Sequence, residues 1–257
     1  MRYSIIGTGN TAWFMAKKLF EAGTECVAVY GRDMAKATAL ADEVNSTGKS
    51  LDAGVQDDAD VCIMAISDHA IAEVCKSLSL KNTILCHTAG AVGIEVLQDA
   101  AINYGVLWPV YSITKNNLPQ TRQIPTVYET NNAASQQLLL QVANSFTDIV
   151  YNADSAQRQM LHLTAVFSNN FSNHLFSIAK RICDDQQLPF SLLLPIIQQT
   201  VSRIENNSPE TTQTGPAKRG DTETQEKHLQ LLQQHTDWQE IYKAVSASIA
   251  EMHLKKN

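Results

Sequence analysis

Apolar and polar positions follow two different periods along the chain. Up to about residue 151, short apolar runs alternate with stretches of helical spacing, which is typical of βα units stacked on a parallel sheet. The predicted strands are Tyr3–Ile6, Cys26–Tyr30, Val61–Ile66, Thr83–Cys86, Asn103–Leu107, Thr126–Tyr128 and Ile149–Tyr151, with a weaker one around Ser50 and Leu51. The predicted helices between them are Thr11–Glu21, Met34–Val44, Ile71–Ser77, Ile94–Ala101 and Ala133–Phe146.

Beyond residue 152 the strand-like runs stop and the pattern predicts long helices: Ser155–Asp184, Phe190–Ile204, Thr222–Gln234 and Trp238–His253. One side of the first helix is apolar and therefore needs a partner surface, which favours a homodimer: Met160, Phe167, Phe171, Leu175, Ile178 and Ile182. The segment from Asn206 to Asp221 is polar and contains two prolines and two glycines, which predicts an extended loop. Loops of this length are often functional.

The composition excludes several classes of protein. Of the 257 residues, 44% are hydrophobic and 18% charged, as in a globular protein. The net charge of -6 argues against a nucleic-acid partner, whereas a small anionic ligand needs only a local cluster of cations. The five cysteines lack metal-ligand spacing with each other or with histidine, so we expect no metal site. Without a visible signal segment or a membrane-length apolar run, a cytoplasmic protein with no membrane contact is expected.

The strongest motif is RYSIIGTGNTA at residues 2–12, in which a buried strand leads through a glycine-rich turn into a helix. Gly7 allows the tight turn, Gly9 lets the backbone approach a pyrophosphate, and Ala12 permits close packing of helix on strand. The phosphates would bind the open N–H groups of the helix N-terminus, and the alternative is an ordinary turn that binds nothing. The predicted cofactor contacts in this turn are Gly7, Thr8, Gly9, Asn10 and Thr11.

The fold class that follows is α/β. An N-terminal Rossmann dinucleotide-binding domain is expected over residues 1–152, and a C-terminal all-helical domain for dimerisation and substrate binding over residues 153–257.

The end of the second strand favours NADP over NAD. Gly31 and Arg32 lie where an NAD site usually places a carboxylate for the ribose, and a cation suits the 2′-phosphate of NADP. Asp33 leaves NAD as an alternative, unless it caps the next helix or pairs with Arg32. Ser67 and Asp68, which follow the predicted strand Val61–Ile66, are further candidates for cofactor contact, or else form a helix N-cap.

A histidine at the end of an apolar strand is the candidate proton donor. His87 follows the predicted strand Thr83–Cys86 and would lie at the carboxyl edge of the sheet, where ligands bind in open α/β folds. It could protonate a substrate that accepts hydride. The alternative is a structural histidine that hydrogen-bonds the next turn.

These motifs together resemble a known family. The glycine-rich turn, HTAGA at His87–Ala91, Trp108-Pro109 and TGPAKRGD at Thr214–Asp221 are similar to Rossmann-like proteins with "domain of unknown function 2520", whose members are often described as NADP oxidoreductases. The chain resembles more distantly pyrroline-5-carboxylate reductase and 6-phosphogluconate dehydrogenase-like enzymes. The resemblance implies a nucleotide domain joined to a helical dimerisation domain.

The chain departs from the β-hydroxyacid dehydrogenases at a position that matters for their chemistry. Those enzymes carry a catalytic lysine one helical turn before an asparagine, but Ala165 and Val166 precede Asn169 and Asn170 here. This departure weakens the hydroxyacid interpretation and leaves room for imine reduction. Where this chain has Trp108, the family often has a histidine, so a proton role there is lost or moved.

Two residues of the helical half complete the predicted active site. By analogy, Asn170 would orient the substrate, whereas His162, Asn169 and Asn173 are expected on a solvated face. Arg219, beside a Gly-Pro turn and a helix start, would hold an anionic group, with plain loop chemistry as the alternative.

The hypothesis is an NADP-dependent oxidoreductase that transfers hydride to or from a small carbonyl or imine acid, with His87, Asn170 and Arg219 as the catalytic group. The alternative is a nucleotide-binding sensor or scaffold without redox catalysis.

Overall fold

The computed structural model describes residues 1–254 and divides into two compact units, Met1–Asn169 and Asn170–Asn257. The last three residues of the predicted second domain, 255–257, lie outside the described residues. The first unit continues beyond residue 152 and includes helix α5 (Ser155–Ala165).

One eight-stranded sheet forms the centre of the first unit, in the order β3-β2-β1-β4-β5-β6-β7-β8. Its strands are β1 (Arg2–Ile6), β2 (Glu25–Gly31), β3 (Gly48–Ser50), β4 (Val61–Met64), β5 (Ile84–His87), β6 (Tyr104–Pro109), β7 (Thr126–Thr130) and β8 (Val150–Asn152). Neighbouring strands are parallel except β6 and β7, so the predicted parallel sheet contains one antiparallel pair. A parallel pair needs a crossover connection, and the chain returns from β6 to β7 through a loop instead.

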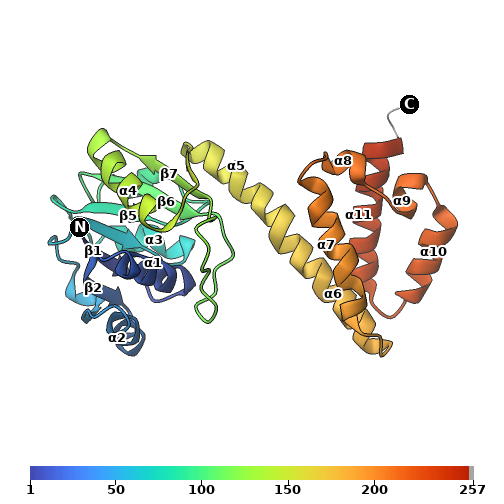
Figure 1. The fold of residues 1–257 in the computed structure, drawn as a ribbon, viewed down its shortest axis with the longest axis horizontal. Coiled ribbons are helices and arrows are strands. Elements are labelled where there is room, and N and C mark those ends of the chain that lie inside the picture. The colour runs from blue at the N-terminus through green and yellow to red at the C-terminus, as the bar shows by residue number, and fades with distance from the viewer. Residues whose placement is uncertain (255–257) are drawn as a thin grey trace. The chain divides into compact units, whose positions relative to one another are not determined.

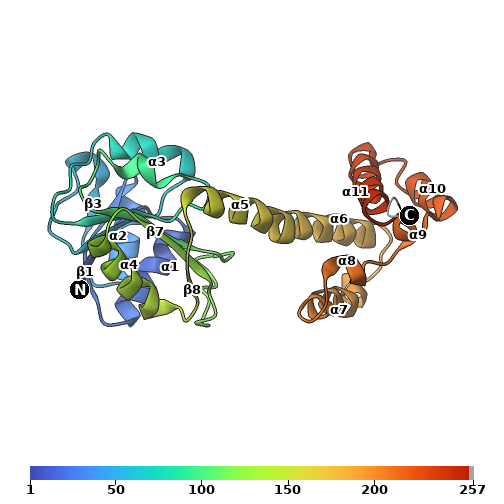
Figure 2. The same ribbon diagram turned by 90° about the horizontal axis from the view of Figure 1, so that it is seen from above.

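Helices cover both faces of this sheet (Figures 1 and 2). α1 (Asn10–Glu21), α2 (Met34–Asp42) and α4 (Ala133–Phe146) pack on one face and share a core with residues of β1 and β4 such as Ile5 and Ile63. α3 (Asp68–Cys75) and the short 3-10 helix η2 (Ile94–Leu97) pack on the other face, with core residues such as Ile6 and Met64. Another short 3-10 helix, η1 (Leu51–Ala53), follows β3. Consecutive residues of a strand thus serve opposite cores, as the period of two requires.

The predicted helix Ile94–Ala101 is shorter than expected, because only Ile94–Leu97 is helical. Ala101 forms an isolated bridge with Leu80, and Leu80 N–H donates to Ala100 at 2.8 Å. Gln98–Ala100 form a turn that leads into this bridge, which the helical spacing did not reveal.

The second unit consists of helices alone. They are α6 (Ser172–Asp185), η4 (Phe190–Leu193), α7 (Leu194–Ile204), α8 (Pro209–Thr212), α9 (Pro216–Arg219), α10 (Thr222–Leu231) and α11 (Thr236–Leu254). The predicted extended loop at 206–221 therefore contains two short helices, α8 and α9. Each begins with proline, whose missing N–H costs nothing in the first turn of a helix.

The long helix that starts at Ser155 is not regular. Asp154 and Gln157 form a capping box at its start. A π-helical segment, η3 (Val166–Phe171), follows α5 and precedes α6. A π-helix has a wider turn than an α-helix, so the regular spacing that predicted one apolar face does not continue through Val166. Among residues 1–254, no helix is long and apolar enough to span a bilayer.

Candidate cofactor and active site

The glycine-rich turn begins at the carboxyl end of β1. Gly7 has a φ of +124°, a conformation that side chains disfavour, and a Cβ there would overlap the Ala65 carbonyl. Its N–H donates to the carbonyl oxygen of Tyr30 at 2.8 Å, which ties the turn to the end of β2. Glycine is therefore required at position 7 for the fold itself.

Gly9 is required for a different reason. It is the N-cap of α1, and no side chain of the described residues caps this helix. A Cβ at Gly9 would meet nothing within 4 Å, so open space lies in front of the helix N-terminus. The first N–H groups and the positive end of the helix dipole are thus available to a phosphate.

A cavity of about 850 Å³ lies over this turn. It is lined by residues that follow β1, β2 and β4, the edge where ligands bind in doubly wound sheets. Of the predicted cofactor residues, these line the cavity: Gly7, Thr8, Gly9, Asn10, Thr11, Gly31, Arg32 and Ser67. Asp68 is not among the lining residues and lies in the first turn of α3.

Two cations line the same cavity beyond β2. Arg32 and Lys36 both contribute to its wall, and Arg32 makes no ion pair within residues 1–254. Asp33 caps α2, because its side chain accepts a hydrogen bond from Lys36 N–H at 3.2 Å and lies 3.1 Å from Lys36 Nζ. The Lys36 N–H and ammonium lower the pKa of Asp33. The carboxylate is thus engaged locally, and the cavity suits a 2′-phosphate beside Arg32.

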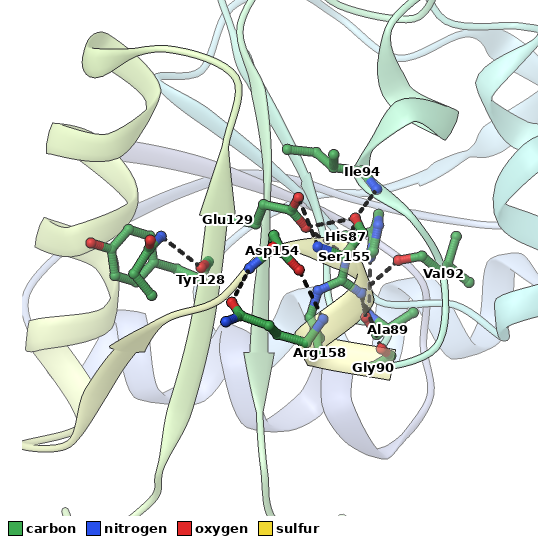
Figure 3. Close-up of polar contacts among 12 residues, drawn as sticks. His87, Ala89, Gly90, Val92, Ile94, Tyr128, Glu129, Asp154, Ser155 and Arg158 are labelled. Atoms are coloured by element: carbon green, nitrogen blue, oxygen red, sulfur yellow. Dashed lines mark hydrogen bonds and ion pairs between the residues drawn. The ribbon is translucent and has the colours of Figure 1, made fainter. Parts of the chain in front are cut away.

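The loop after β5, which contains HTAGA, is held by a fully buried arginine (Figure 3). Arg158 Nη1 donates to the carbonyl oxygens of Ala89 at 3.1 Å, Gly90 at 3.1 Å and Val92 at 2.6 Å. Charge-assisted bonds of this kind are stronger than neutral ones. Helix α5 is therefore locked to the loop that leaves the centre of the sheet.

The charge of Arg158 is balanced by a carboxylate on β7. Arg158 Nη2 lies 2.8 Å from Glu129 Oε2 and donates to Ser155 Oγ at 3.1 Å. Ser155 donates its hydroxyl to Glu129 at 2.8 Å, and its Oγ accepts from Ile94 N–H at 3.1 Å. This ion pair joins β7, α5 and the HTAGA loop into one rigid network (Figure 3).

His87 ends β5 and is fully buried. Nδ1 accepts from Ala89 N–H at 3.1 Å, so the proton of the neutral ring lies on Nε2. Burial lowers the pKa of His87 from 6.5 to about 4, and the positive charge of Arg158 contributes to this shift as the second cause. A hydrogen bond with the Gly93 backbone raises the pKa by a smaller amount. The ring is therefore neutral near pH 7. This environment fits the structural alternative, and the proton-donor role of His87 stays a prediction.

A second histidine lies close to Gly90 of the HTAGA loop. The ring of His162, on α5, is partly exposed and packs 5.7 Å from the ring of Trp108, centroid to centroid, at an angle of 51°. A Cβ on Gly90 would come within 2.6 Å of His162 Cδ2 and 2.7 Å of Trp108 Cε2. Glycine at position 90 thus leaves the space that the two rings fill.

The other two predicted catalytic residues belong to the second unit, apart from the unit of His87. Asn170 is exposed and lies in the π-helical segment, a kind of segment that often occurs at functional sites. Arg219 ends α9 with its side chain 64% exposed and 3.9 Å from Asp221. Asp221 caps α10 (Thr222–Leu231) by accepting from Thr224 N–H at 3.0 Å.

Sequence patterns missed Arg158 and Lys36. Lys36 had a usable signal, since it lies one turn after Arg32 on the helix that leaves β2. Arg158 had none, because the carbonyl groups it binds are 66 to 69 residues away in the chain.

The sheet order, the glycine-rich turn and the cavity define a Rossmann-type dinucleotide-binding protein with a helical second unit. The family model for a domain of unknown function (DUF2520) matches residues 124–249. The model described as "NADP oxidoreductase coenzyme F420-dependent" matches residues 2–89. Among curated proteins, no sequence matches the chain.

Solved structures show the same fold along the whole chain. A "putative NADP oxidoreductase" from Bacteroides fragilis is 33% identical, with 97% of this chain and 98% of that chain covered and a TM-score of 0.90. The chain belongs to this DUF2520-containing family of NADP oxidoreductases. These matches confirm three predictions at the level of the family: the fold class, an oxidoreductase function and NADP as the cofactor.

More distant structures share the fold. A 1-pyrroline-5-carboxylate reductase from Streptococcus pyogenes is 18% identical, with 98% of each chain covered and a TM-score of 0.65. An imine reductase from Myxococcus stipitatus, solved with NADP⁺, is 15% identical, with 98% of this chain and 93% of that chain covered and a TM-score of 0.68.

Proposed function

We propose that this chain is a reductase that binds NADP(H) in the cavity over Gly7 and Gly9 and transfers hydride to a small carbonyl or imine acid. One observation carries the proposal: the uncapped N-terminus of α1 and the cation Arg32 face the same cavity of about 850 Å³. The helix N-terminus suits the pyrophosphate, and Arg32 with Lys36 suits the 2′-phosphate. When bound, the reduced nicotinamide supplies the hydride.

The choice of a C=N or C=O acid as substrate has two supports. No lysine lies at 165 or 166, which is unlike the hydroxyacid dehydrogenases and fits a double bond that is already polarised. Proteins of the same fold include a pyrroline-5-carboxylate reductase and an imine reductase. Within the proposal, Arg219 holds an anionic group of the substrate and Asn170 orients the reacting group, and His87 is the sequence-based candidate for the proton donor.

We propose in addition that two copies of the chain associate through their helical units. Large apolar side chains of this unit are exposed to solvent, which is costly for an isolated chain: Leu188 at 54%, Leu192 at 70%, Ile196 at 60% and Val201 at 56%. A second copy that covers them would remove this cost.

The expected cytoplasmic location of the protein stays a prediction.

A reductase screen tests the proposal. Purified protein is mixed with NADPH and with a panel of cyclic imines, imino acids and 2-oxo acids, and the loss of reduced nicotinamide absorbance is followed. We expect turnover of at least one compound by the wild type and none by Gly9→Asp. The aspartate has open space and would cap α1 in place of the phosphate. Tight NADPH binding without turnover of any compound would favour the sensor alternative.

A further inference from the structure

The His162 ring is packed against other residues, although the sequence predicted a solvated face for it. Its ring packs against Trp108 on β6 and over Gly90 in the loop after β5. Trp108 itself is buried, at 9% exposure. A side chain at position 90 would displace one of the two rings, so the loop is shaped to accept the imidazole.

The preceding turn of α5 is anchored to the same loop. Arg158, one turn earlier, is held by three main-chain carbonyls of the same loop and by Glu129. The backbone of α5 that carries His162 is therefore held beside this loop by a buried network. A side chain that must act on a bound molecule benefits from this kind of rigid support.

The ring also lies near the carboxyl edge of the sheet, where the dinucleotide is expected to bind. The strand order reverses between β1 and β4, and a dinucleotide binds across the carboxyl edge at such a point. The adenosine end of the cavity lies beyond β2, at Gly31 and Arg32. The nicotinamide end must then extend past β4 toward β5 and β6, where the HTAGA loop and Trp108 present His162.

We propose that His162 is the catalytic residue that gives a proton to the substrate beside the nicotinamide, an inference that rests on the proposed function. As hydride adds to the carbon of the C=N or C=O bond, the π electron pair moves to nitrogen or oxygen. That atom takes a proton from the His162 imidazolium, which leaves a neutral ring. Because His162 is partly exposed, water can restore its proton, whereas His87 is fully buried.

The location can be tested without a substrate. The full-length protein, isotopically labelled at histidine, is titrated with NADP⁺ or with adenosine 2′,5′-bisphosphate, and the imidazole NMR signals are followed. The spectrum of His162→Gln assigns the His162 signal. We expect NADP⁺ to shift this signal and adenosine 2′,5′-bisphosphate, which lacks the nicotinamide, to leave it in place. The signal of His174, an exposed histidine of α6, serves as the control.

The outcomes separate this inference from the function it rests on. If calorimetry shows that NADP⁺ binds while the His162 signal stays unchanged, the inference is wrong and the proposed function stands. If NADP⁺ does not bind, both fail. A shifted His162 signal supports the location.

Kinetics of the variants test the proton step on any compound that the wild type reduces. Because general acid catalysis contributes 10²–10⁴-fold, His162→Gln and His162→Phe should lower kcat by about 100-fold while the KM for NADPH stays within about twofold. His162→Phe keeps an aromatic ring against Trp108, so packing alone would preserve its activity. His174→Gln should behave as the wild type. Undiminished kcat in His162→Phe would overturn the proton role.

Discussion

The two units of this chain treat their apolar side chains in opposite ways. The first unit encloses two cores, one on each face of its sheet, and buries residues such as Tyr3, Phe14 and Met64 completely. In the part of the second unit that the structure describes, only Ala217 and Trp238 are buried. Its large apolar residues, such as Leu192 and Ile196, face solvent.

This difference divides the two tasks of the proposed enzyme between the units. The first unit builds its cofactor cavity from its own turns and needs no other chain to form it. The described helices of the second unit enclose no core of matching size, and in the proposed homodimer a second copy covers their exposed apolar side chains. Variants that act on one unit alone can break or sharpen this comparison.

The largest expected effect is on the buried network of the first unit. Arg158→Met should lower the free energy of unfolding by about 4 kcal/mol, because it leaves the Glu129 carboxylate, whose side chain is only 15% exposed, and three loop carbonyls without their charged partner. Lys180→Met is the control in the second unit, where the Lys180–Asp184 pair is more than half exposed. Its effect should stay below about 1 kcal/mol. Equal losses in urea unfolding would contradict the contrast between the units.

The next effect separates folding from binding within one turn. Gly7→Ala should destabilise the first unit by about 3 kcal/mol, because the new Cβ meets the Ala65 carbonyl at a positive φ. Gly9→Ala should unfold like the wild type yet bind NADPH at least about tenfold more weakly, since its methyl group occupies space meant for phosphate. Thermal unfolding and calorimetry measure the two quantities. A stable Gly7→Ala protein would show that the turn is not under this constraint.

Association of the second unit is tested on one face of α7. Ile196→Glu should weaken the homodimer by about 100-fold, or about 2.7 kcal/mol, because a carboxylate would be buried in the contact. Gln199→Glu is the control, because it adds the same charge to the same helix at an already polar position. Sedimentation velocity gives the mass of each variant. A monomeric wild type at micromolar concentration would remove the proposed association.

A smaller effect reports on His87. Its pKa is lowered from 6.5 to about 4 on folding, so the unfolded chain binds more protons between these values and stability falls as the pH drops. The wild type should lose about 2 kcal/mol at pH 5 relative to pH 8 from this group, and His87→Asn should lack this part of the loss. His69→Asn, at an exposed position, should keep the wild-type slope. Identical slopes for the wild type and His87→Asn would show that His87 is not held neutral.

Much of the first unit could be predicted from sequence, because its signals are local. The apolar runs and the turn from Gly7 to Thr11 identify strand, turn and helix within a dozen residues. The antiparallel step to β7 could not be predicted, since strand direction depends on the path of the connecting loop. The site of Arg158 escaped prediction for a similar reason: its partners are main-chain atoms far away in the chain, which carry no residue signature.

The helical half shows where periodicity fails. A regular spacing predicted one continuous helix with a single apolar face, but the π-helical segment Val166–Phe171 interrupts the period. The same assumption placed His162 on a solvated face, whereas its ring packs against Trp108 of β6, a contact that only the tertiary structure creates.

The central claim is that the cavity over Gly7 and Gly9 binds NADP(H) and that Arg32 recognises its 2′-phosphate. Calorimetric titration of the wild type and of Arg32→Ser with NADPH and with NADH tests it most directly. A charge-assisted contact contributes about 1.5–3 kcal/mol, so the wild type should prefer NADPH by about 10- to 100-fold and Arg32→Ser should lose most of this preference. Absence of binding, or equal affinity of the wild type for both dinucleotides, would contradict the claim.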